Sequence, residues 1–254
     1  MELWTNEHIR TLLPSVAVMI VLAVLLRLWL GKKDLSVRRI PLQVIACALV
    51  LLEIGKQTFS LARGYDLYHL PFHFCSLFIF ALPGMAFYRG KHEQTVGGVV
   101  SALCASVFLL MLIYPNLIYS AWDVNHFFKD YFAFHTVAFH NLVMLAFLLI
   151  VALNLHETVR SGTEIRALVI FMTGFGVVAA TMSQLLKTKY ANMYTCNIPV
   201  LEELRLTVKG VIGAVPTQLL YVTIVSLLQI GFTVMAYWFY RLLRTLSRKM
   251  RKQT

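Results

Sequence analysis

The chain has 254 residues, of which 59% are hydrophobic and only 14% are charged. Soluble proteins carry roughly a quarter of charged residues, so this composition excludes an ordinary soluble enzyme and favours a protein embedded in a membrane. The net charge of +11 does not indicate nucleic-acid binding, because the basic residues lie at the ends of apolar segments and in the C-terminal tail, where they meet anionic lipid headgroups.

Seven apolar segments follow one another along the chain. Each is close in length to the roughly 20 residues that a helix needs to cross a bilayer. No basic region precedes the first segment, so we expect it to be retained rather than cleaved as a signal peptide. The segments are 12–30, 41–62, 70–88, 96–114, 131–155, 164–186 and 217–240. We therefore predict an all-α polytopic membrane protein, a seven-helix bundle that forms one domain over residues 1–254.

The basic residues predict the orientation of this bundle. Fourteen Lys and Arg residues flank the segment ends on the side of the C-terminus, including the tail 241–254, and seven flank the opposite ends. Because cytoplasmic ends carry the excess of Lys and Arg, we predict an N-terminus outside and a C-terminus in the cytoplasm. We expect the protein in the plasma membrane if it is bacterial and in an endomembrane if it is eukaryotic.

Two polar residues at one depth are the first candidates for a site. Cys75 follows the start of the third segment, in HLPFHFCSL, and lies about 7 Å below its outer end as an ideal helix. His135 opens the fifth segment, in YFAFHTVAFH, and lies about 6 Å deep. A cysteine thiol needs a base to become a nucleophile, and histidine is the usual one. The sequence thus predicts Cys75 as a nucleophile and His135 as its base.

Further polar residues are candidates for supporting roles. Glu53 and Lys56 are three residues apart in the second segment, so they share a helix face and can neutralise each other. An acid at this depth indicates function, because charges inside a membrane are costly. Glu53 would orient His135 or hold the bundle together with Lys56. Asn192, in the outer connection after the sixth segment, is a candidate amide donor to an oxyanion.

The same cysteine and histidine residues also allow other roles. Cys75 is a packing residue in one alternative, and it forms a disulfide with Cys196 in another. His69 and His73 are one turn apart and would make a three-histidine metal site with His135, although we expect no metal and no cofactor. His140 lies about 140° around the helix from His135, so we assign it a secondary role.

The third-segment motif LPFHFCSL resembles the Leu-Pro-x-His-x-Cys-Ser signature of the YwaF-type integral membrane family, to which the transmembrane protein 164 ether-phospholipid acyltransferase belongs. Glu53, His135 in YFAFH and Asn192 in ANMY fit the same pattern, so the likeness covers most of the chain. The resemblance implies a seven-helix bundle in which Cys75 and His135 act on acyl lipids. The chain is more distantly similar to the androgen-induced hydrolases, which use a threonine and a histidine on lipid esters.

These observations together predict a cysteine-dependent lipid acyltransferase or transacylase near the extracytoplasmic side of the membrane. A phospholipid would donate the acyl chain and a lysophospholipid would accept it, with His73, Glu53, Asn192 and Lys56 in supporting roles. A lipid ester hydrolase, with water as the acceptor, is one alternative. A transporter or receptor that binds a small ligand through Glu53 and Lys56 is another.

Overall fold

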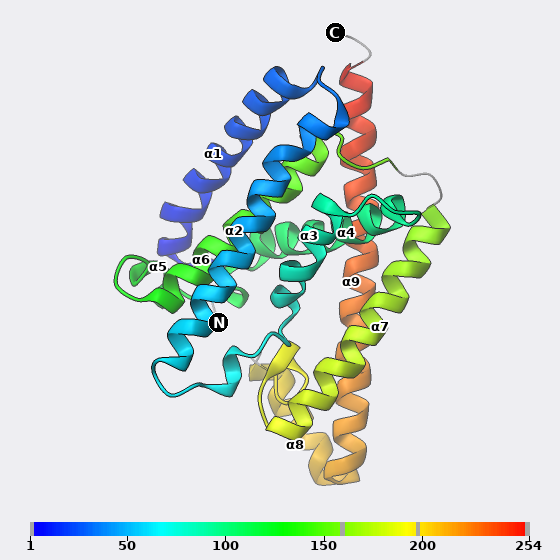
Figure 1. Cartoon of the computed structure of the whole chain (residues 1–254). Coiled ribbons are helices and arrows are strands. Elements are labelled where there is room, and N and C mark those ends of the chain that lie inside the picture. The colour runs from blue at the N-terminus through cyan, green and yellow to red at the C-terminus, as the bar shows by residue number, and fades with distance from the viewer. Residues whose placement is uncertain (1–2, 158–160, 197–198, 252–254) are drawn as a thin grey trace.

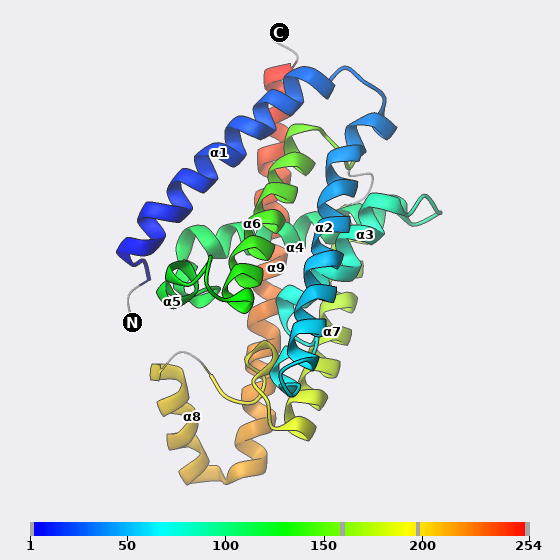
Figure 2. The same ribbon diagram turned by 60° about the vertical axis from the view of Figure 1, so that its left-hand side comes forward.

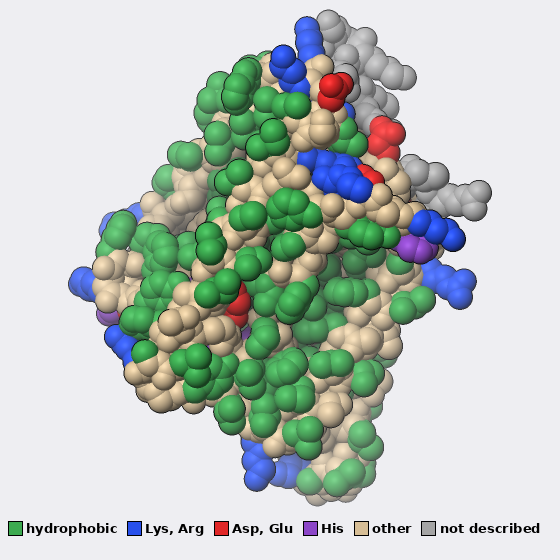
Figure 3. All heavy atoms as spheres, in the orientation of Figure 1, with side chains coloured by type: hydrophobic (Ala, Val, Ile, Leu, Met, Phe, Trp, Pro, Cys, Tyr) green, Lys and Arg blue, Asp and Glu red, His purple; other side chains and the backbone are tan. Residues whose placement is uncertain are grey.

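The computed structural model describes residues 3–157, 161–196 and 199–251, and the regular elements in this part of the chain are all helices, with no strand (Figure 1). Six of its helices are long and apolar enough to cross a membrane. They are α1 (Asn6–Leu30), α2 (Leu35–Leu61), α4 (Glu93–Ile113), α6 (Tyr131–Ala152), α7 (Ser161–Leu186) and α9 (Ala214–Arg251). Hydrophobic side chains cover much of the face drawn in Figure 3, as expected for a surface in contact with lipid. The protein is therefore an integral membrane protein of the all-α class.

The predicted third segment, 70–88, differs from the single regular helix that we expected. After a short 3₁₀ helix, η1 (Leu67–His69), the backbone is extended at Leu70 and again at His73. A second 3₁₀ turn, η2 (Phe74–Leu77), follows, and α3 (Phe78–Phe87) begins only after it. Pro71 explains the interruption, because proline has no N–H to donate and disfavours helical backbone at the residue before it. The remaining apolar stretch, Phe74–Phe87, is shorter than the six long helices.

Helix α4 lies at the centre of the fold and runs crosswise to α9, as Figures 1 and 2 both show. It contacts α3, α6, α7 and α9, and its residues from Gly97 to Phe108 are all buried. Small residues in this stretch allow the neighbouring helices to approach closely. Its two buried hydroxyls, Ser101 and Ser106, donate to carbonyl oxygens one turn earlier, at 2.6 and 2.8 Å. No polar side chain of this buried stretch is left without a partner.

A buried polar cluster joins α4, α7 and α9 next to the end of α6. Glu164 accepts a hydrogen bond from the Tyr237 hydroxyl at 2.8 Å, and its other oxygen lies 3.4 Å from His156 Nε2. His156 Nδ1 lies 2.9 Å from the Tyr240 hydroxyl. A Cβ atom at Gly98 would lie 2.5 Å from the Glu164 carboxylate, so this position has room only for glycine. The glycine thus allows the carboxylate to be buried against the central helix.

The connection between α7 and α9 is folded rather than extended. It contains a 3₁₀ turn, η4 (Tyr190–Asn192), and an exposed amphipathic helix, α8 (Pro199–Ile212), that packs against α9. Two further short elements, η3 (Pro115–Leu117) and α5 (Ala121–Asn125), connect α4 to α6. The predicted tail, 241–254, continues α9 as far as Arg251, and residues 252–254 lie outside the described part of the chain.

We expect Gly98→Ala to destabilise the protein by about 1–3 kcal/mol, because the added methyl group would overpack the buried Glu164 carboxylate. Gly174→Ala in α7 is the matched control, since its Cβ meets nothing within 4 Å. Thermal unfolding in detergent, followed by circular dichroism, measures both changes. Equal midpoints for the two variants would contradict this account of the packing between α4 and α7.

Candidate functional site

A cavity of about 530 Å³ lies between α2, η2, α4, α6, η4 and α9, within the usual size of small-molecule sites. Its wall contains each of the six side chains that the sequence analysis proposed for the site. These are Glu53, Lys56, His73, Cys75, His135 and Asn192. They come from four separate regions of the chain, so it is the fold that brings them around one space.

Within this cavity Cys75 contacts His140 rather than His135. The Cys75 Sγ atom lies 2.8 Å from His140 Nε2, and His140 Nδ1 lies 2.7 Å from the carbonyl oxygen of Thr136. A carbonyl oxygen can only accept a hydrogen bond, so we assign the ring proton to Nδ1. Nε2 then presents its lone pair to the thiol. A thiol, an imidazole and a carbonyl oxygen that orients the imidazole are thus in contact, the arrangement that enzymes use to activate a thiol nucleophile.

The assignment of His135 as the partner of Cys75 therefore needs correction, and the irregular backbone before α3 is one reason. The prediction compared depths along ideal helices, whereas Cys75 lies in the 3₁₀ turn η2. Depth also leaves the rotation of a helix undetermined. In α6 the residue that turns toward Cys75 is His140, five positions after His135. The sequence YFAFHTVAFH contains both histidines, so His140 was visible as a candidate. Only the contact of α6 with η2 shows which of the two histidines meets Cys75.

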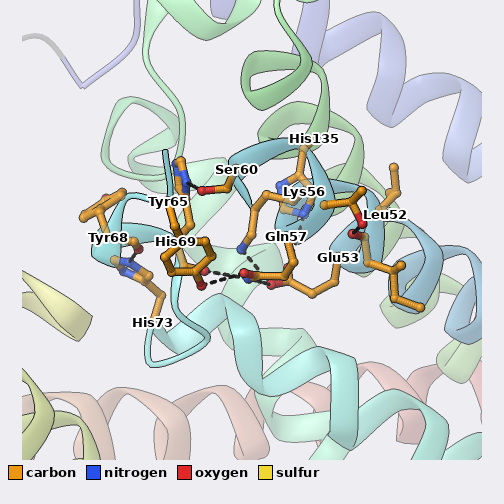
Figure 4. A network of polar contacts seen from close by, with 12 residues as sticks. Leu52, Glu53, Lys56, Gln57, Ser60, Tyr65, Tyr68, His69, His73 and His135 are labelled. Atoms are coloured by element: carbon orange, nitrogen blue, oxygen red, sulfur yellow. Dashed lines mark hydrogen bonds and ion pairs between the residues drawn. The ribbon is translucent and has the colours of Figure 1, made fainter. Parts of the chain in front are cut away.

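His135 faces Glu53 instead, with its Nε2 atom 3.4 Å from the carboxylate (Figure 4). Glu53 also accepts a hydrogen bond from Gln57 at 2.7 Å and forms an ion pair with Lys56 at 2.8 Å. The Gln57 amide donates in turn to the carbonyl oxygen of His69 at 2.7 Å. Glu53 thus contacts both predicted partners, the imidazole and the ammonium group. The network ties α2 to α6 and to the segment before η2.

The histidines of the three-histidine alternative point to separate partners. His69 Nδ1 lies 2.7 Å from the Ser60 hydroxyl, and His73 Nε2 lies 2.9 Å from the Tyr68 carbonyl oxygen, while His135 faces Glu53. Burial lowers the pKa of both His69 and His73, which favours their neutral forms. Among the described residues, no three His, Cys, Asp or Glu side chains are grouped so that they could hold a metal ion.

Asn192 lies on a loop with unusual backbone geometry. Ala191 and Asn192 have φ angles of 47° and 60°, in the left-handed region that side chains other than glycine rarely adopt. Two side chains of α9 hold this conformation: Gln229 donates to the Ala191 carbonyl at 2.9 Å, and Tyr221 donates to the Asn192 carbonyl at 2.6 Å. Strained backbone that is held by its surroundings is common at functional sites.

All four cysteines belong to the described residues, and none of them forms a disulfide. Cys196, the partner in the disulfide alternative, lies beside α8, where its backbone N–H donates to Glu202 at 3.0 Å. Cys104 is buried in α4, and Cys47 is exposed on α2. Of the four, only Cys75 both lines the cavity and contacts an imidazole.

The fold and the site define a helical membrane protein with a buried thiol–imidazole pair in the wall of a cavity. The family model of the TMEM164 family matches residues 3–236, which is most of the chain, and the protein belongs to this family. The match confirms the relationship that the motif around Cys75 indicated. No curated protein and no solved structure matches the chain.

We expect His140→Ala to slow the alkylation of Cys75 by iodoacetamide about tenfold or more, because the thiolate is the reactive form and His140 is placed to take the thiol proton. His135→Ala is the matched control, in the same helix and lining the same cavity. Mass spectrometry of the Cys75 peptide over time measures both rates. A larger effect of His135→Ala would restore His135 as the base.

We expect Glu53→Gln to destabilise the protein by about 3–5 kcal/mol, because it leaves the buried Lys56 ammonium group without its counter-charge. The double variant Glu53→Gln/Lys56→Met removes both charges and should recover most of the loss. Thermal unfolding of both variants in detergent tests this expectation. If the double variant unfolds no later than the single variant, the ion pair is not the source of the stability.

Proposed function

We propose that this protein is a membrane-embedded lipid acyltransferase that uses Cys75 as its nucleophile and His140 as its base. The contact between Cys75 Sγ and His140 Nε2 in the cavity wall is the observation that carries the proposal. Membership of the TMEM164 family and the resemblance to an ether-phospholipid acyltransferase support it. His140 takes over the role that the sequence analysis gave to His135.

In the first half of the reaction, the proton of the Cys75 thiol moves to His140 Nε2 and the sulfur attacks the ester carbonyl of a phospholipid. The bond between the carbonyl carbon and the alcohol oxygen breaks, and the acyl chain remains on sulfur as a thioester. The departing lysophospholipid oxygen takes the proton from His140. Because the His140 Nδ1–H donates to the Thr136 carbonyl, the ring keeps its orientation through both proton transfers.

In the second half, the hydroxyl group of a lysophospholipid attacks the thioester. Its proton moves to His140, the carbon–sulfur bond breaks, and the sulfur recovers the proton. We assign to the Asn192 side chain a hydrogen bond to the carbonyl oxygen as negative charge develops there, since this amide lines the cavity. The reaction needs no cofactor, because no electrons are transferred and both proton steps use side chains of the chain.

The cavity wall also suits a lipid substrate because it combines two kinds of surface. One part is polar and contains Glu53, Lys56 and the histidines, whereas another part is apolar and contains Leu110, Leu117 and Phe232. An ester group needs the first surface, and the acyl chain attached to it needs the second. The positive-inside pattern supports our proposal that this cavity lies toward the extracytoplasmic side of the membrane.

The Glu53–Lys56 pair also lines the cavity, but each of these groups already neutralises the other. A transporter or receptor would have to separate this buried pair in order to bind a charged ligand, which costs several kcal/mol. The thiol–imidazole contact needs no such rearrangement. Acyl transfer is therefore the function that the geometry supports best, and hydrolysis follows from the same chemistry when water replaces the acceptor.

An assay of the purified protein with labelled diacyl phospholipid and unlabelled lysophospholipid tests this function. We expect label to appear on the lysophospholipid with the wild-type protein and a thioester to be trapped on Cys75. Cys75→Ala should abolish both signals, and His140→Ala should slow transfer about 100- to 10,000-fold. Cys47→Ala is the matched control, because this cysteine is exposed on α2, away from the cavity.

Two results would contradict the proposal. Transfer that persists in Cys75→Ala would exclude the thioester. Labelled free fatty acid without labelled phospholipid would identify a hydrolase instead. If no lipid ester reacts and Glu53→Gln abolishes binding of a small ligand while Cys75→Ala does not, the binding-protein alternative would replace the enzyme.

A further inference from the structure

The loop between α7 and α8 presents a second polar side chain, Lys189, to the cavity beside Asn192. The loop is held from α7, where Ser183 donates to the Tyr190 carbonyl at 3.1 Å and Gln184 donates to the Met193 carbonyl at 3.0 Å. Both views show it next to the segment that leads into η2 (Figures 1 and 2). There the hydroxyl of the buried Tyr190 donates to the Leu67 carbonyl. Hydrogen bonds thus hold the backbone of the loop that carries Lys189.

Of the charged side chains in the cavity wall, Lys189 is the cation that can bind an anionic ligand. Four Asp, Glu, Lys and Arg side chains line the cavity, two acidic and two basic. Glu53 and Lys56 form an ion pair, while Asp123 accepts hydrogen bonds from the backbone N–H and the hydroxyl of Ser120 at 2.7 and 2.8 Å. Within the described part of the chain, Lys189 forms no ion pair. Lys189 is exposed and lines the cavity.

We infer that Lys189 binds the phosphate group of the phospholipid donor while Cys75 attacks its ester, an assignment that rests on the proposed acyltransferase function. An ammonium group binds phosphate as a compact point charge, and the charge strengthens the hydrogen bond. In a glycerophospholipid the phosphate and the esters share one glycerol unit. The loop carries Lys189 and Asn192 three residues apart, one for the phosphate and one for the ester carbonyl. Lys189 thus makes the site selective for a phosphate-bearing lipid over a neutral acylglycerol.

Lys187 provides a matched control for this assignment. It is exposed on the same loop, two residues before Lys189, and it does not line the cavity. Replacing either lysine removes the same charge from the same side of the protein. If the lysines act by general attraction to an anionic membrane surface, the two changes should weaken lipid binding equally. If Lys189 forms a phosphate subsite, only its replacement should do so.

The experiment measures formation of the Cys75 thioester in detergent micelles, without an acceptor, from a phospholipid and from a diacylglycerol with the same acyl chains. For the phospholipid, we expect Lys189→Gln to raise the half-saturating concentration about three- to tenfold, with an unchanged maximal rate. For the diacylglycerol, neither value should change. Lys189→Arg should recover phospholipid use to within about twofold, since it restores the charge. Lys187→Gln should match the wild type with both lipids.

The possible outcomes separate this inference from the proposed function. Thioester formation with equal behaviour of Lys189→Gln and Lys187→Gln would overturn the phosphate assignment and leave the acyltransferase intact. Inorganic phosphate that alters the diacylglycerol reaction in the wild type but not in Lys189→Gln would identify a site for free phosphate instead. Absence of a thioester with every lipid in the wild type would remove the proposed function, and this inference with it.

Discussion

The absence of water from the membrane interior is the constraint on which this structure depends, because each buried polar group must find its partner within the protein. Two networks meet this requirement. Glu53 joins Lys56, Gln57 and His135 between α2 and α6, and Glu164 joins His156 and Tyr237 between α7 and α9. Each network links helices that are distant in sequence. The polar residues therefore determine which helices meet, in a setting where apolar burial alone distinguishes them poorly.

The candidate site follows the same rule, because its buried thiol also has a partner within the protein. The Cys75 thiol is satisfied by His140, which is held in turn by the Thr136 carbonyl. A contact of this kind satisfies two buried groups and also places a base against a nucleophile. The interruption at Pro71 makes it possible, because it turns the backbone of Cys75 out of a regular helix. The contact that gives the buried thiol a hydrogen-bond partner is thus also the contact on which the proposed activation of Cys75 rests.

One part of the cavity wall is formed by a strained loop. Ala191 and Asn192 have left-handed backbone, and Gln229 and Tyr221 of α9 donate hydrogen bonds to their carbonyl oxygens. Such strain costs of the order of 1–3 kcal/mol per residue, and it persists where surrounding contacts outweigh it. Here it places Asn192 and Lys189 at the cavity that contains the thiol. The long helix α9 therefore contributes to the site in two ways, by holding this loop and by lining the cavity with Gln229, Phe232 and Thr233.

The helical membrane class, the approximate places of six long helices and the family could be predicted without a structure, because hydrophobic runs and the motif around Cys75 are local properties of the chain. The sequence also indicated six of the side chains that line the cavity, five of them because polar residues are rare in apolar segments and stand out there, and Asn192 from the outer connection. Only the tertiary structure decided that residues 70–77 are irregular, that His140 rather than His135 meets Cys75, and that Lys189 reaches the cavity. The reason is physical: spacing along a helix gives depth, whereas the rotation of a helix and the path of a loop depend on contacts with distant segments.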